Sequence, residues 1–566
     1  MTHDGWTFEI LRSDLLIIGG GAAGIAAAVR ARELEPELDV LVMEKAHVKR
    51  SGCLAAGINA INAYLNPGET PLTFLAYVRE DAHGLVREDL VLSLAEKLNS
   101  VTDRLAAWGL PLPRDAQGNY LPRGRRSVRV DGEGIKPLMA RALEASGARV
   151  LNRVNATNFF LSAGRVRGAF GFSMREKKFY LVQAFATVCA TGGAAGIYKP
   201  NNPGAASHKM WYCPFNTGAG YAMGLRAGAE MTSFEMRFIA LRVKDTLSPT
   251  GTIAQGVKVE QVNALGENYQ KRYRGNTTPL RLYATLQENL AGRGPCYLDT
   301  TGLDREAGEK LKEAYLHMSP GILLKWADQG VEPWERPVEI CGSEPYLAGG
   351  HGLAGYWVDT GRRTTVAGLY AAGDVAGGAP KKYVSGSMAE GEIAAASAVQ
   401  DMQAVSFEEL PAAELARALE LEAAMVLAPL TRQEGFAPRE LEERLQKVMD
   451  EYAGGIGSSY RVSGPSLLVA REELAQLSAD LARLKARDLH ELLSAQEVID
   501  RVLVARVLVE HLLYRQETRW PCYQERLDYP QRDDTNWLKF VNSRYHWRED
   551  RVEMLERPYW RHGEQA

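Results

Sequence analysis

Cysteine is scarce in this chain: 566 residues hold only six, far apart and without any C-x-x-C spacing. They are Cys53, Cys189, Cys213, Cys296, Cys341 and Cys522. This distribution suggests neither a disulfide framework nor a zinc or iron–sulfur site, so we expect no metal site in this chain. Cys53 follows a glycine closely, and we interpret it as a small buried thiol without a redox role.

Two further absences narrow the class of protein. The formal net charge is only -3 and the basic residues are scattered, so we expect no nucleic-acid partner. The N-terminus shows no basic segment followed by an apolar one, and the apolar stretch 15–29 is interrupted by glycines and too short to span a bilayer. We therefore expect a cytoplasmic protein with no transmembrane segment.

The first thirty residues carry the most informative pattern that is present. Asp14–Ile18 is a short apolar run typical of a buried parallel strand, and a segment rich in helix formers follows it. The turn between them contains Gly19, Gly21 and Gly24 in G-x-G-x-x-G spacing. Such glycines permit a tight turn, close approach of amides to a pyrophosphate and close helix–strand packing. The pattern predicts a dinucleotide site at a helix N-terminus.

Three later strand ends extend this site. The predicted strand 40–43 ends in Glu44, which is placed to accept a hydrogen bond from a ribose hydroxyl. Predicted strands between residues 149 and 189 end in Ala190–Gly193, and a later strand ends in Ala371–Asp374, followed by a helix that Ser385–Ser387 opens. We predict an α/β fold with a Rossmann-like domain, in which two separated halves meet around one cofactor.

The remaining segments predict further domains. Residues 241–347 mix short helices and turns without strong strand alternation, as in a domain inserted to cap the site. Residues 406–519 form long charged helices with apolar residues at helical spacing, which predicts a helical domain. Residues 520–566 are rich in aromatics, Asp and Arg with little periodicity, so we expect an arm over other elements or a partner. The cofactor-binding domain then comprises 1–240 and 348–405.

These segments together resemble the flavoprotein subunits of the succinate dehydrogenase and fumarate reductase superfamily. The resemblance implies an extended FAD, an inserted capping domain and a C-terminal helical domain. Arg50-Ser51-Gly52 stands where many members carry Arg-Ser-His, whose histidine bonds to the flavin, so Gly52 predicts noncovalent FAD. The fumarate reductase run Gln-Phe-His-Pro-Thr has no counterpart in Glu230–Arg237, and a fumarate site is not expected.

A second group of short stretches is similar to the alpha subunit of dissimilatory adenylylsulfate reductase, which interconverts adenosine 5'-phosphosulfate with AMP and sulfite. These stretches are Ala60–Tyr64, Gly132–Glu133, Lys136–Pro137, Tyr221–Gly224, Arg242–Asp245, Gly292–Pro295, the turn at His351, Tyr383 and Glu517–Pro521. Each is short, so only their order is specific. Gln255 and Tyr383 stand where that family usually has Leu and Phe.

The resemblance implies roles for individual residues. Arg242, His351 and Asn62 match catalytic residues around the sulfate and the flavin, and a guanidinium offers forked donors to sulfate oxygens. Glu133, Arg281 and Tyr383 match substrate-binding positions. The cofactor-binding positions are Gly19, Gly21, Gly24, Glu44, Lys45, Ser51, Gly52, Thr191, Gly192, Asp374 and Ser387. Since electrons need a relay, the resemblance also implies a small ferredoxin-like iron–sulfur subunit as partner.

Taken singly, several of these side chains have simpler interpretations. His351 could be a turn histidine, Arg242 and Arg281 could form surface ion pairs, and Asn62 could cap a turn. Their joint match to one site favours the functional interpretation. Two other functions stay open: a superfamily enzyme that acts on an enoate or dicarboxylate, and a flavin electron-transfer module without a substrate of its own.

Overall fold

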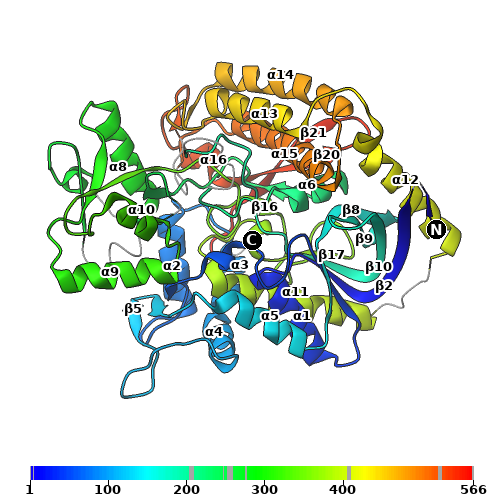
Figure 1. The fold of residues 1–566 in the computed structure, drawn as a ribbon, viewed down its shortest axis with the longest axis horizontal. Helices are drawn as coiled ribbons and strands as arrows, with labels where there is room; N and C mark the ends of the chain where they lie inside the picture. Colours follow the sequence, from blue (N-terminus) through cyan, green and yellow to red (C-terminus); the bar gives the residue numbers. More distant parts are fainter. Residues whose placement is uncertain are drawn as a thin grey trace.

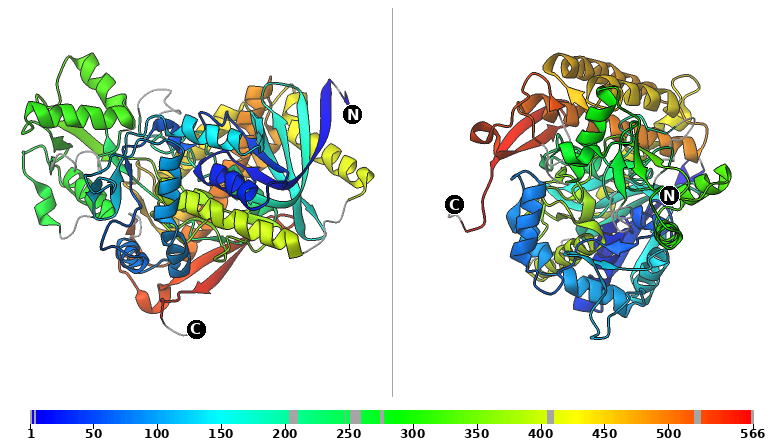
Figure 2. Two further views of the ribbon diagram at one scale, coloured as in Figure 1. Left: turned by 90° about the horizontal axis from the view of Figure 1, so that it is seen from below. Right: turned by 90° about the vertical axis from the view of Figure 1, so that its left-hand side faces the viewer.

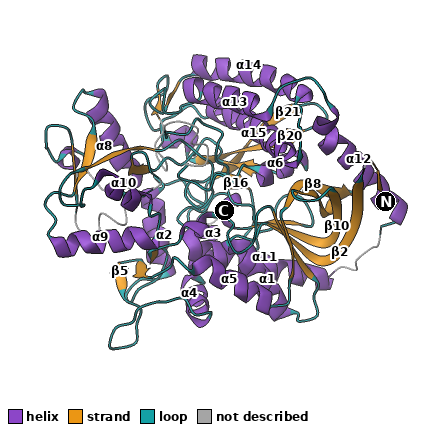
Figure 3. Cartoon of the chain, in the orientation of Figure 1, coloured by secondary structure: helices purple, strands orange, loops and turns teal. Residues whose placement is uncertain are grey.

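The computed structural model describes residues 2–3, 5–202, 210–246, 248–250, 259–273, 277–404, 410–519 and 525–563. Gln255, Cys522 and the end of the Glu517–Pro521 stretch lie outside these residues. The described chain is a mixed α/β protein, which confirms the predicted fold class (Figures 1 and 3). None of its described helices combines the length and the apolar character needed to cross a membrane.

An eight-stranded sheet forms the centre of the nucleotide-binding part. Its strands are β1 (Thr2–His3), β2 (Trp6–Ile18), β3 (Val40–Glu44), β7 (Arg149–Asn152), β8 (Val154–Ser162), β9 (Arg165–Ser173), β10 (Lys178–Cys189) and β17 (Leu369–Ala371). The path runs β7-β3-β2-β10-β9-β8, and β17 also pairs with β10. Strands β7, β3, β2, β10 and β17 pair in parallel, so their carboxyl ends share one edge.

Two helices cross beside this edge. Helix α1 (Ala22–Leu34) packs along α11 (Tyr383–Ala404), with α5 (Ile135–Ala145) next to α1 (Figure 1). The two backbones touch at Gly391, where a Cβ would lie 2.1 Å from the carbonyl oxygen of Ala23. A contact this close excludes every larger residue without a shift of one helix. The pairing brings the N-terminus of each helix to the same end of the sheet.

The segment expected to cap the site contains a sheet that sequence analysis did not predict. Four antiparallel strands lie in the order β12-β15-β14-β13. They are β12 (Leu241–Val243), β13 (Glu260–Val262), β14 (Cys296–Asp299) and β15 (Val338–Gly342), accompanied by η2 (Tyr269–Arg272), α8 (Thr278–Leu290), α9 (Arg305–His317) and α10 (Gly321–Gln329). Strands of three to five residues are too short to show alternation. Figure 2 shows this segment in green at one end of the molecule.

The predicted C-terminal helices are present. They are α12 (Ala412–Thr431), α13 (Pro438–Tyr452), α14 (Gly464–Asp480) and α15 (Leu489–Tyr514). Helix α14 ends at Asp480, and η4 (Leu481–Arg483) follows it. The start of α14 is fixed by Ser463, whose side chain accepts a hydrogen bond from the Ser466 amide in a capping box. Helices α13, α14 and α15 pack together, whereas α12 covers the far end of the large sheet.

The last segment was expected to form an arm over other elements or a partner, and its described residues contain a hairpin. Strands β20 (Lys539–His546) and β21 (Arg551–Pro558) pair antiparallel and extend β11 (Met231–Thr232) and β16 (Gly355–Tyr356) into a four-stranded sheet. This hairpin is drawn in red in Figure 2.

The remaining elements are η1 (Cys53–Ala56), β4 (Ala60–Ile61), α2 (Pro71–Asp81), α3 (Glu88–Ala95), α4 (Leu98–Ala107), β5 (Pro122–Gly124), β6 (Ser127–Arg129), α6 (Ala219–Arg226), η3 (Gly373–Val375), β18 (Arg461–Val462), β19 (Glu525–Arg526) and α16 (Asp534–Trp537).

A buried chain of charges anchors this hairpin to α15. The carboxylate of Glu235 accepts from Arg515 Nε at 2.7 Å and lies 2.9 Å from His511 Nδ1, and all three side chains are fully buried. Arg515 also bonds Glu517 at 2.9 Å. The other ring nitrogen of His511 lies 2.9 Å from Ser543 Oγ in β20. The side chains therefore connect three segments that are far apart in sequence.

We expect Glu235→Ala to lower the free energy of unfolding by about 3–5 kcal/mol, because it removes one of the two carboxylates that pair with the buried Arg515 and leaves Nε of Arg515 without its acceptor. Burial alone would raise the pKa of Glu235, but Arg515 and His511 outweigh it and hold that pKa below its ordinary value. The stabilisation is therefore complete above the unfolded pKa and disappears as pH falls through the lower folded value. Urea unfolding at several pH values measures both effects. Glu306→Ala, in an exposed pair with Lys310, is the control and should change stability by less than about 1 kcal/mol.

Candidate functional site

A cavity of about 370 Å³ lies at the carboxyl edge of the large sheet. Its wall includes Ile18, Glu44 and Ala372, which end or follow β2, β3 and β17. Segments from residue 18 to residue 387 contribute to it, so both halves of the predicted cofactor domain line one space. Ligands of open α/β sheets bind at this position, outside the carboxyl ends of the strands.

The three motif glycines occupy three different environments. Gly19 has φ 103°, and a Cβ there would lie 2.4 Å from the carbonyl oxygen of Ala190. A Cβ on Gly24 would lie 1.9 Å from the carbonyl oxygen of Gly19. Gly21 is the N-cap of α1 without a side-chain cap, and nothing lies within 4 Å of its Cβ direction. The first amides of α1 therefore face an open space that suits an anion.

The carboxylate of Glu44 holds the backbone around this turn. One oxygen accepts from the amide of Gly20 and the other from the amide of Ala46, each at 2.7 Å. Ser51 Oγ donates to the Gly20 carbonyl at 3.4 Å, and the buried Lys136 Nζ donates to the same oxygen. Burial lowers the pKa of Lys136 to about 8, although Glu44 opposes the shift. Sequence analysis noted Lys136 but gave it no role.

Lys45 and Gly52 also line the cavity, with different surroundings. Lys45 Nζ pairs with Glu497 of α15 at 2.8 Å, so its charge also ties the helical segment to the cavity wall. Gly52 has φ 73° and leaves an ordinary 3.7 Å between a Cβ and Gly21 Cα. Because residue 52 is glycine, it has no side chain that could bond covalently to a cofactor in the cavity.

The opposite wall is organised around Asp374. Its Oδ2 accepts from the hydroxyl of Tyr212 at 2.7 Å, and that hydroxyl in turn accepts from the amide of Gly193 at 2.9 Å. Thr191, Gly192 and Ser387 line the same cavity. A side chain on Gly192 would meet Asn216 at 2.3 Å, so the wall is tightly fitted at this point.

Aromatic rings surround His351 on this side of the cavity. Ring centroids of Phe238, Trp211 and Tyr383 lie 5.2, 5.5 and 5.9 Å from its imidazole. Its Nδ1 lies 3.8 Å from Asp374 Oδ2 and has no hydrogen-bond partner within the described part of the chain. Burial lowers the pKa of His351 despite that carboxylate. The imidazole is therefore neutral near pH 7, with one N–H available for donation.

Asn62 and Tyr383 lie on the cavity wall near each other in the fold. Asn62 directly follows β4, and the next residue, Ala63, accepts a 2.6 Å hydrogen bond from Ser385 Oγ at the start of α11. Tyr383 begins α11 with φ 48°, and burial raises the pKa of its phenol to about 12. Both therefore present neutral polar groups to the cavity.

Four predicted residues lie outside the cavity wall: Gly24 of the glycine motif, and Arg242, Glu133 and Arg281. Arg242 is fully buried behind it, donating to the carbonyls of Thr246 at 2.9 Å and Asn201 at 2.8 Å. Its Nε has no partner among the described atoms, and its backbone bridges Pro249, which lines the cavity. The simpler interpretation of Arg242 as a surface ion-pair residue is therefore wrong.

Glu133 and Arg281 mark the junction with the capping segment. Glu133 is exposed, and its Oε2 lies 2.7 Å from Nδ1 of His317, just before Met318 and Ser319 on the cavity wall. Arg281 lies on α8, donates to Thr278 Oγ1 at 3.3 Å and lines a second cavity of about 260 Å³. Burial lowers the pKa of Arg281.

Sequence analysis missed the aromatic lining and misplaced one thiol. Trp211, Tyr212 and Phe215 line the cavity, yet they belong to no motif that a single sequence reveals. Cys53 was expected to be buried, and its side chain is exposed on the cavity wall instead. The described residues contain no cluster of three or more His, Cys, Asp or Glu side chains that could hold a metal.

Comparisons with known proteins agree with this architecture. Residues 14–388 match the family described as FAD binding domain, and residues 442–560 match the fumarate reductase flavoprotein C-terminus. The adenylylsulfate reductase subunit alpha of Megalodesulfovibrio gigas is 32% identical, over 97% of this chain and 95% of that protein. The E. coli quinol fumarate reductase, at 20% identity and a TM-score of 0.82 over 97% of each chain, shares the fold.

Two solved structures extend the likeness. Adenylylsulfate reductase from Archaeoglobus fulgidus superimposes with a TM-score of 0.92 at 36% identity, covering 100% of this chain and 98% of that one. A structure described as adenosine-5-phosphosulfate reductase with sulfite as a covalent adduct gives the same values. The chain belongs to the FAD-binding flavoproteins of the succinate dehydrogenase and fumarate reductase superfamily. Within that class it is a homologue of the adenylylsulfate reductase alpha subunit, and thus an FAD-dependent oxidoreductase.

The different environments of Gly24 and Gly21 predict different defects. Gly24→Ala should lower both the melting temperature of the flavin-free protein and its affinity for FAD, because overpacking typically costs about 1–3 kcal/mol. Gly21→Ala has room for its methyl group and ordinary φ, so it should weaken FAD binding alone. Thermal unfolding and flavin titration of each apoprotein separate the two. Equal melting temperatures for both variants would contradict the packing role of Gly24.

Proposed function

We propose that this chain is the catalytic flavoprotein subunit of an enzyme that interconverts adenosine 5'-phosphosulfate with AMP and sulfite. The observation that carries the proposal is its likeness, at 36% identity and a TM-score of 0.92 over the whole chain, to a reductase that holds sulfite as a covalent adduct. Relatives named as fumarate reductases are less similar, as the 25% identical protein from Methanothermobacter marburgensis shows. Residues 230–237 lack the Gln-Phe-His-Pro-Thr run of fumarate reductases, which is consistent with the proposed reaction.

The cavity suits FAD. The uncapped N-terminus of α1 at Gly21 is open to a pyrophosphate, and Glu44 keeps further acceptor capacity for a ribose hydroxyl. We assign Asp374, which accepts a hydrogen bond from Tyr212, to the sugar chain of the flavin. When bound, FAD supplies the two-electron redox chemistry, whereas the protein binds, orients and excludes water.

The proposed substrate side lies around His351, Asn62 and Arg242. The neutral imidazole of His351 donates one N–H toward the oxygens of a sulfate or sulfite, and the surrounding rings keep water from that bond. Asn62 adds an amide donor from the opposite segment. Arg242 stands behind the wall with Nε unpaired among the described atoms, and we assign its guanidinium to the same anion.

The nucleotide side of the substrate is assigned to Glu133 and Arg281, and Tyr383 is assigned to substrate binding beside His351. Glu133 and Arg281 lie where the capping segment meets the cofactor domain, the position at which a substrate enters beneath a cap. The proposed divisions are 1–240 with 348–405 for FAD, 241–347 for the cap, 406–519 for the helical domain and 520–566 for the arm. A ferredoxin-like iron–sulfur subunit as electron partner and a cytoplasmic location belong to the same proposal.

Acid precipitation should release all the FAD into the supernatant, because position 52 is glycine and offers no linking histidine. The absorbance spectrum of the supernatant and of the washed pellet measures the released and retained flavin. A covalently linked fumarate reductase flavoprotein, treated in parallel, should keep its flavin in the pellet. Yellow colour in the pellet of this protein would contradict the noncovalent assignment.

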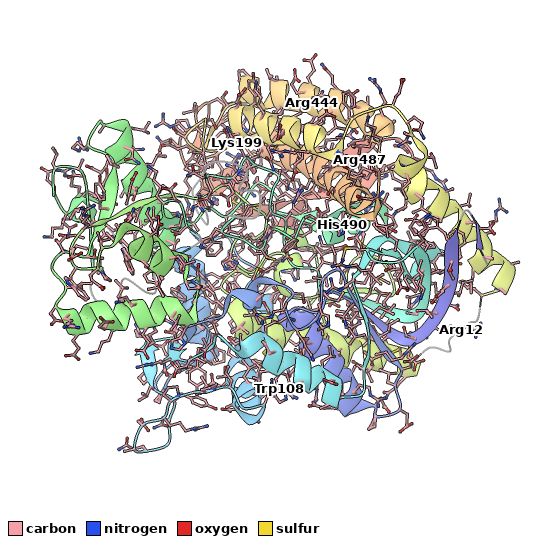
Figure 4. The ribbon with its side chains drawn as sticks, viewed as in Figure 1. Arg12, Trp108, Lys199, Arg444, Arg487 and His490 are labelled. Atoms are coloured by element: carbon pink, nitrogen blue, oxygen red, sulfur yellow. The ribbon has the colours of Figure 1, made fainter. Side chains whose placement is uncertain are left out.

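We expect His351→Ala to lower turnover of adenosine 5'-phosphosulfate about 10²–10³-fold while FAD stays bound, since losing one donor aimed at developing charge costs about 2.7–4 kcal/mol. Because its pKa is lowered, the histidine stays neutral to below pH 6.5, so the parent enzyme should show no loss from its protonation above that pH. His490→Ala, at the exposed start of α15 (Figure 4), is the matched control and should behave like the parent.

Turnover assays with different substrates also distinguish the proposed reaction from a dicarboxylate reductase and from an electron-transfer module. Rates with adenosine 5'-phosphosulfate, with AMP plus sulfite, and with fumarate identify the substrate. Turnover of fumarate alone would replace the proposed reaction with a dicarboxylate reduction. Failure of sulfite to bleach the bound flavin, together with no turnover of any substrate, would favour an electron-transfer module.

A further inference from the structure

Lys136 is a buried cation whose hydrogen bond goes to the backbone of the glycine turn. The residue lies in the first turn of α5, and only 1% of its surface is exposed. Its Nζ donates to the carbonyl oxygen of Gly20. A positive charge is unfavourable in the first turn of a helix, and its burial is costly without a paired carboxylate. Packing alone therefore does not account for a lysine at this position.

Three consecutive peptide groups of the glycine turn are each held by a different partner. The amide of Gly20 donates to Oε2 of Glu44 at 2.7 Å, which fixes the first peptide. The carbonyl of Gly20 accepts from Lys136, which fixes the second. The carbonyl of Gly21 accepts from the amide of Ile25 at 3.0 Å, which fixes the third. Lys136 is thus the side chain that holds the peptide between Gly20 and Gly21.

The bond from Lys136 sets the direction of the Gly21 amide. The peptide that joins Gly20 to Gly21 is trans, so its C=O and its N–H point in opposite directions. Gly21 lines the cavity, whereas Gly20 and Lys136 lie behind the wall. With the oxygen held toward Lys136, the N–H of Gly21 is directed into the cavity. An N–H at a helix N-terminus is a group from which a phosphate accepts a hydrogen bond.

The charged and titratable groups around Lys136 come from several packed elements. Glu44 of β3 favours the ammonium, but burial is the stronger effect and lowers the pKa of Lys136 to about 8. Arg32 of α1 lies at the far end of α5, where it donates to the carbonyl of the C-cap residue. Glu133, just before α5, is exposed, and Cys53 of η1 is exposed on the cavity wall. Lys136 is therefore charged at neutral pH and loses its proton in mildly alkaline solution.

We propose that Lys136 is a cofactor-positioning residue, whose ammonium holds the Gly20–Gly21 peptide with the Gly21 amide directed at the pyrophosphate of FAD. Lys136 acts through this peptide and does not touch the cofactor. A cation at the carbonyl end polarises the peptide and strengthens the donor at its N–H end. The same charge attracts the pyrophosphate through a protein interior that screens it less than water does. FAD affinity therefore depends on the charge of Lys136.

Release of FAD from the diluted holoenzyme, followed by flavin fluorescence, tests the proposal. Lys136→Met keeps a side chain of similar length but has neither the charge nor the donor. At neutral pH it should raise the Kd for FAD about 10–100-fold, the effect of one hydrogen bond from a charged group. Lys49→Met is the matched control, because it removes an exposed lysine next to Arg50 of the cavity wall. The control should keep the affinity of the parent.

The pH dependence of FAD release separates this role from a purely structural one. In the parent, the Kd for FAD should rise above about pH 8, by at most about tenfold per pH unit, as the ammonium loses its proton. Lys136→Met and Lys136→Arg should lack this rise, because methionine has no proton to lose and a guanidinium keeps its own. Lys49→Met should show the rise of the parent.

Three results would overturn the proposal. They are parental FAD affinity in Lys136→Met, a parental rise of Kd with pH in that variant, and a Kd of the parent that stays constant up to about pH 9.5. The last measurement needs no variant, so it decides the question even if the substitutions prevent folding. No substrate enters these experiments, and their failure leaves the proposed reaction untouched.

Discussion

The contact between the first glycine turn and the end of β10 is the constraint on which the site depends. At Gly19 the backbone passes so close to Ala190 that no Cβ fits, and at Gly24 the helix passes equally close to Gly19. These contacts fix the exit of α1 from the sheet and therefore the direction in which its free amides point. The close contact of Gly391 with Ala23 fixes the position of α11 against α1. The second wall of the cavity thus takes its position from the first.

Residues close in sequence were predictable, because their chemistry is local. The glycine turn, Glu44 at the end of β3 and the ending of β10 each combine a strand with the turn that follows it. Parallel pairing then brings such ends to one edge, so a sequence predicts their meeting without knowing the fold in detail. The family likeness fixed FAD as the cofactor. It also placed His351 at the cavity, which an isolated histidine does not reveal.

Features assembled from distant or very short segments were not predictable. The aromatic enclosure joins Trp211, Phe238 and Tyr383, which lie far apart along the chain. The strands of the capping sheet are too short to alternate visibly. Arg242 was matched to the substrate by likeness, and the structure places it one layer behind the wall. Only tertiary packing decides such positions.

The strand order of the smaller sheet has a consequence for biosynthesis. Strand β20, supplied by residues 539–546, is the inner neighbour of β11, which directly follows a helix of the cofactor cavity. The ribosome therefore releases β20 long after β11. Until then, Met231 and Thr232 have at most one of their two partner strands, β16. The layer that supports the cavity is therefore complete only once residues 539–546 have been made, and a truncation before residue 539 removes an inner strand of this sheet.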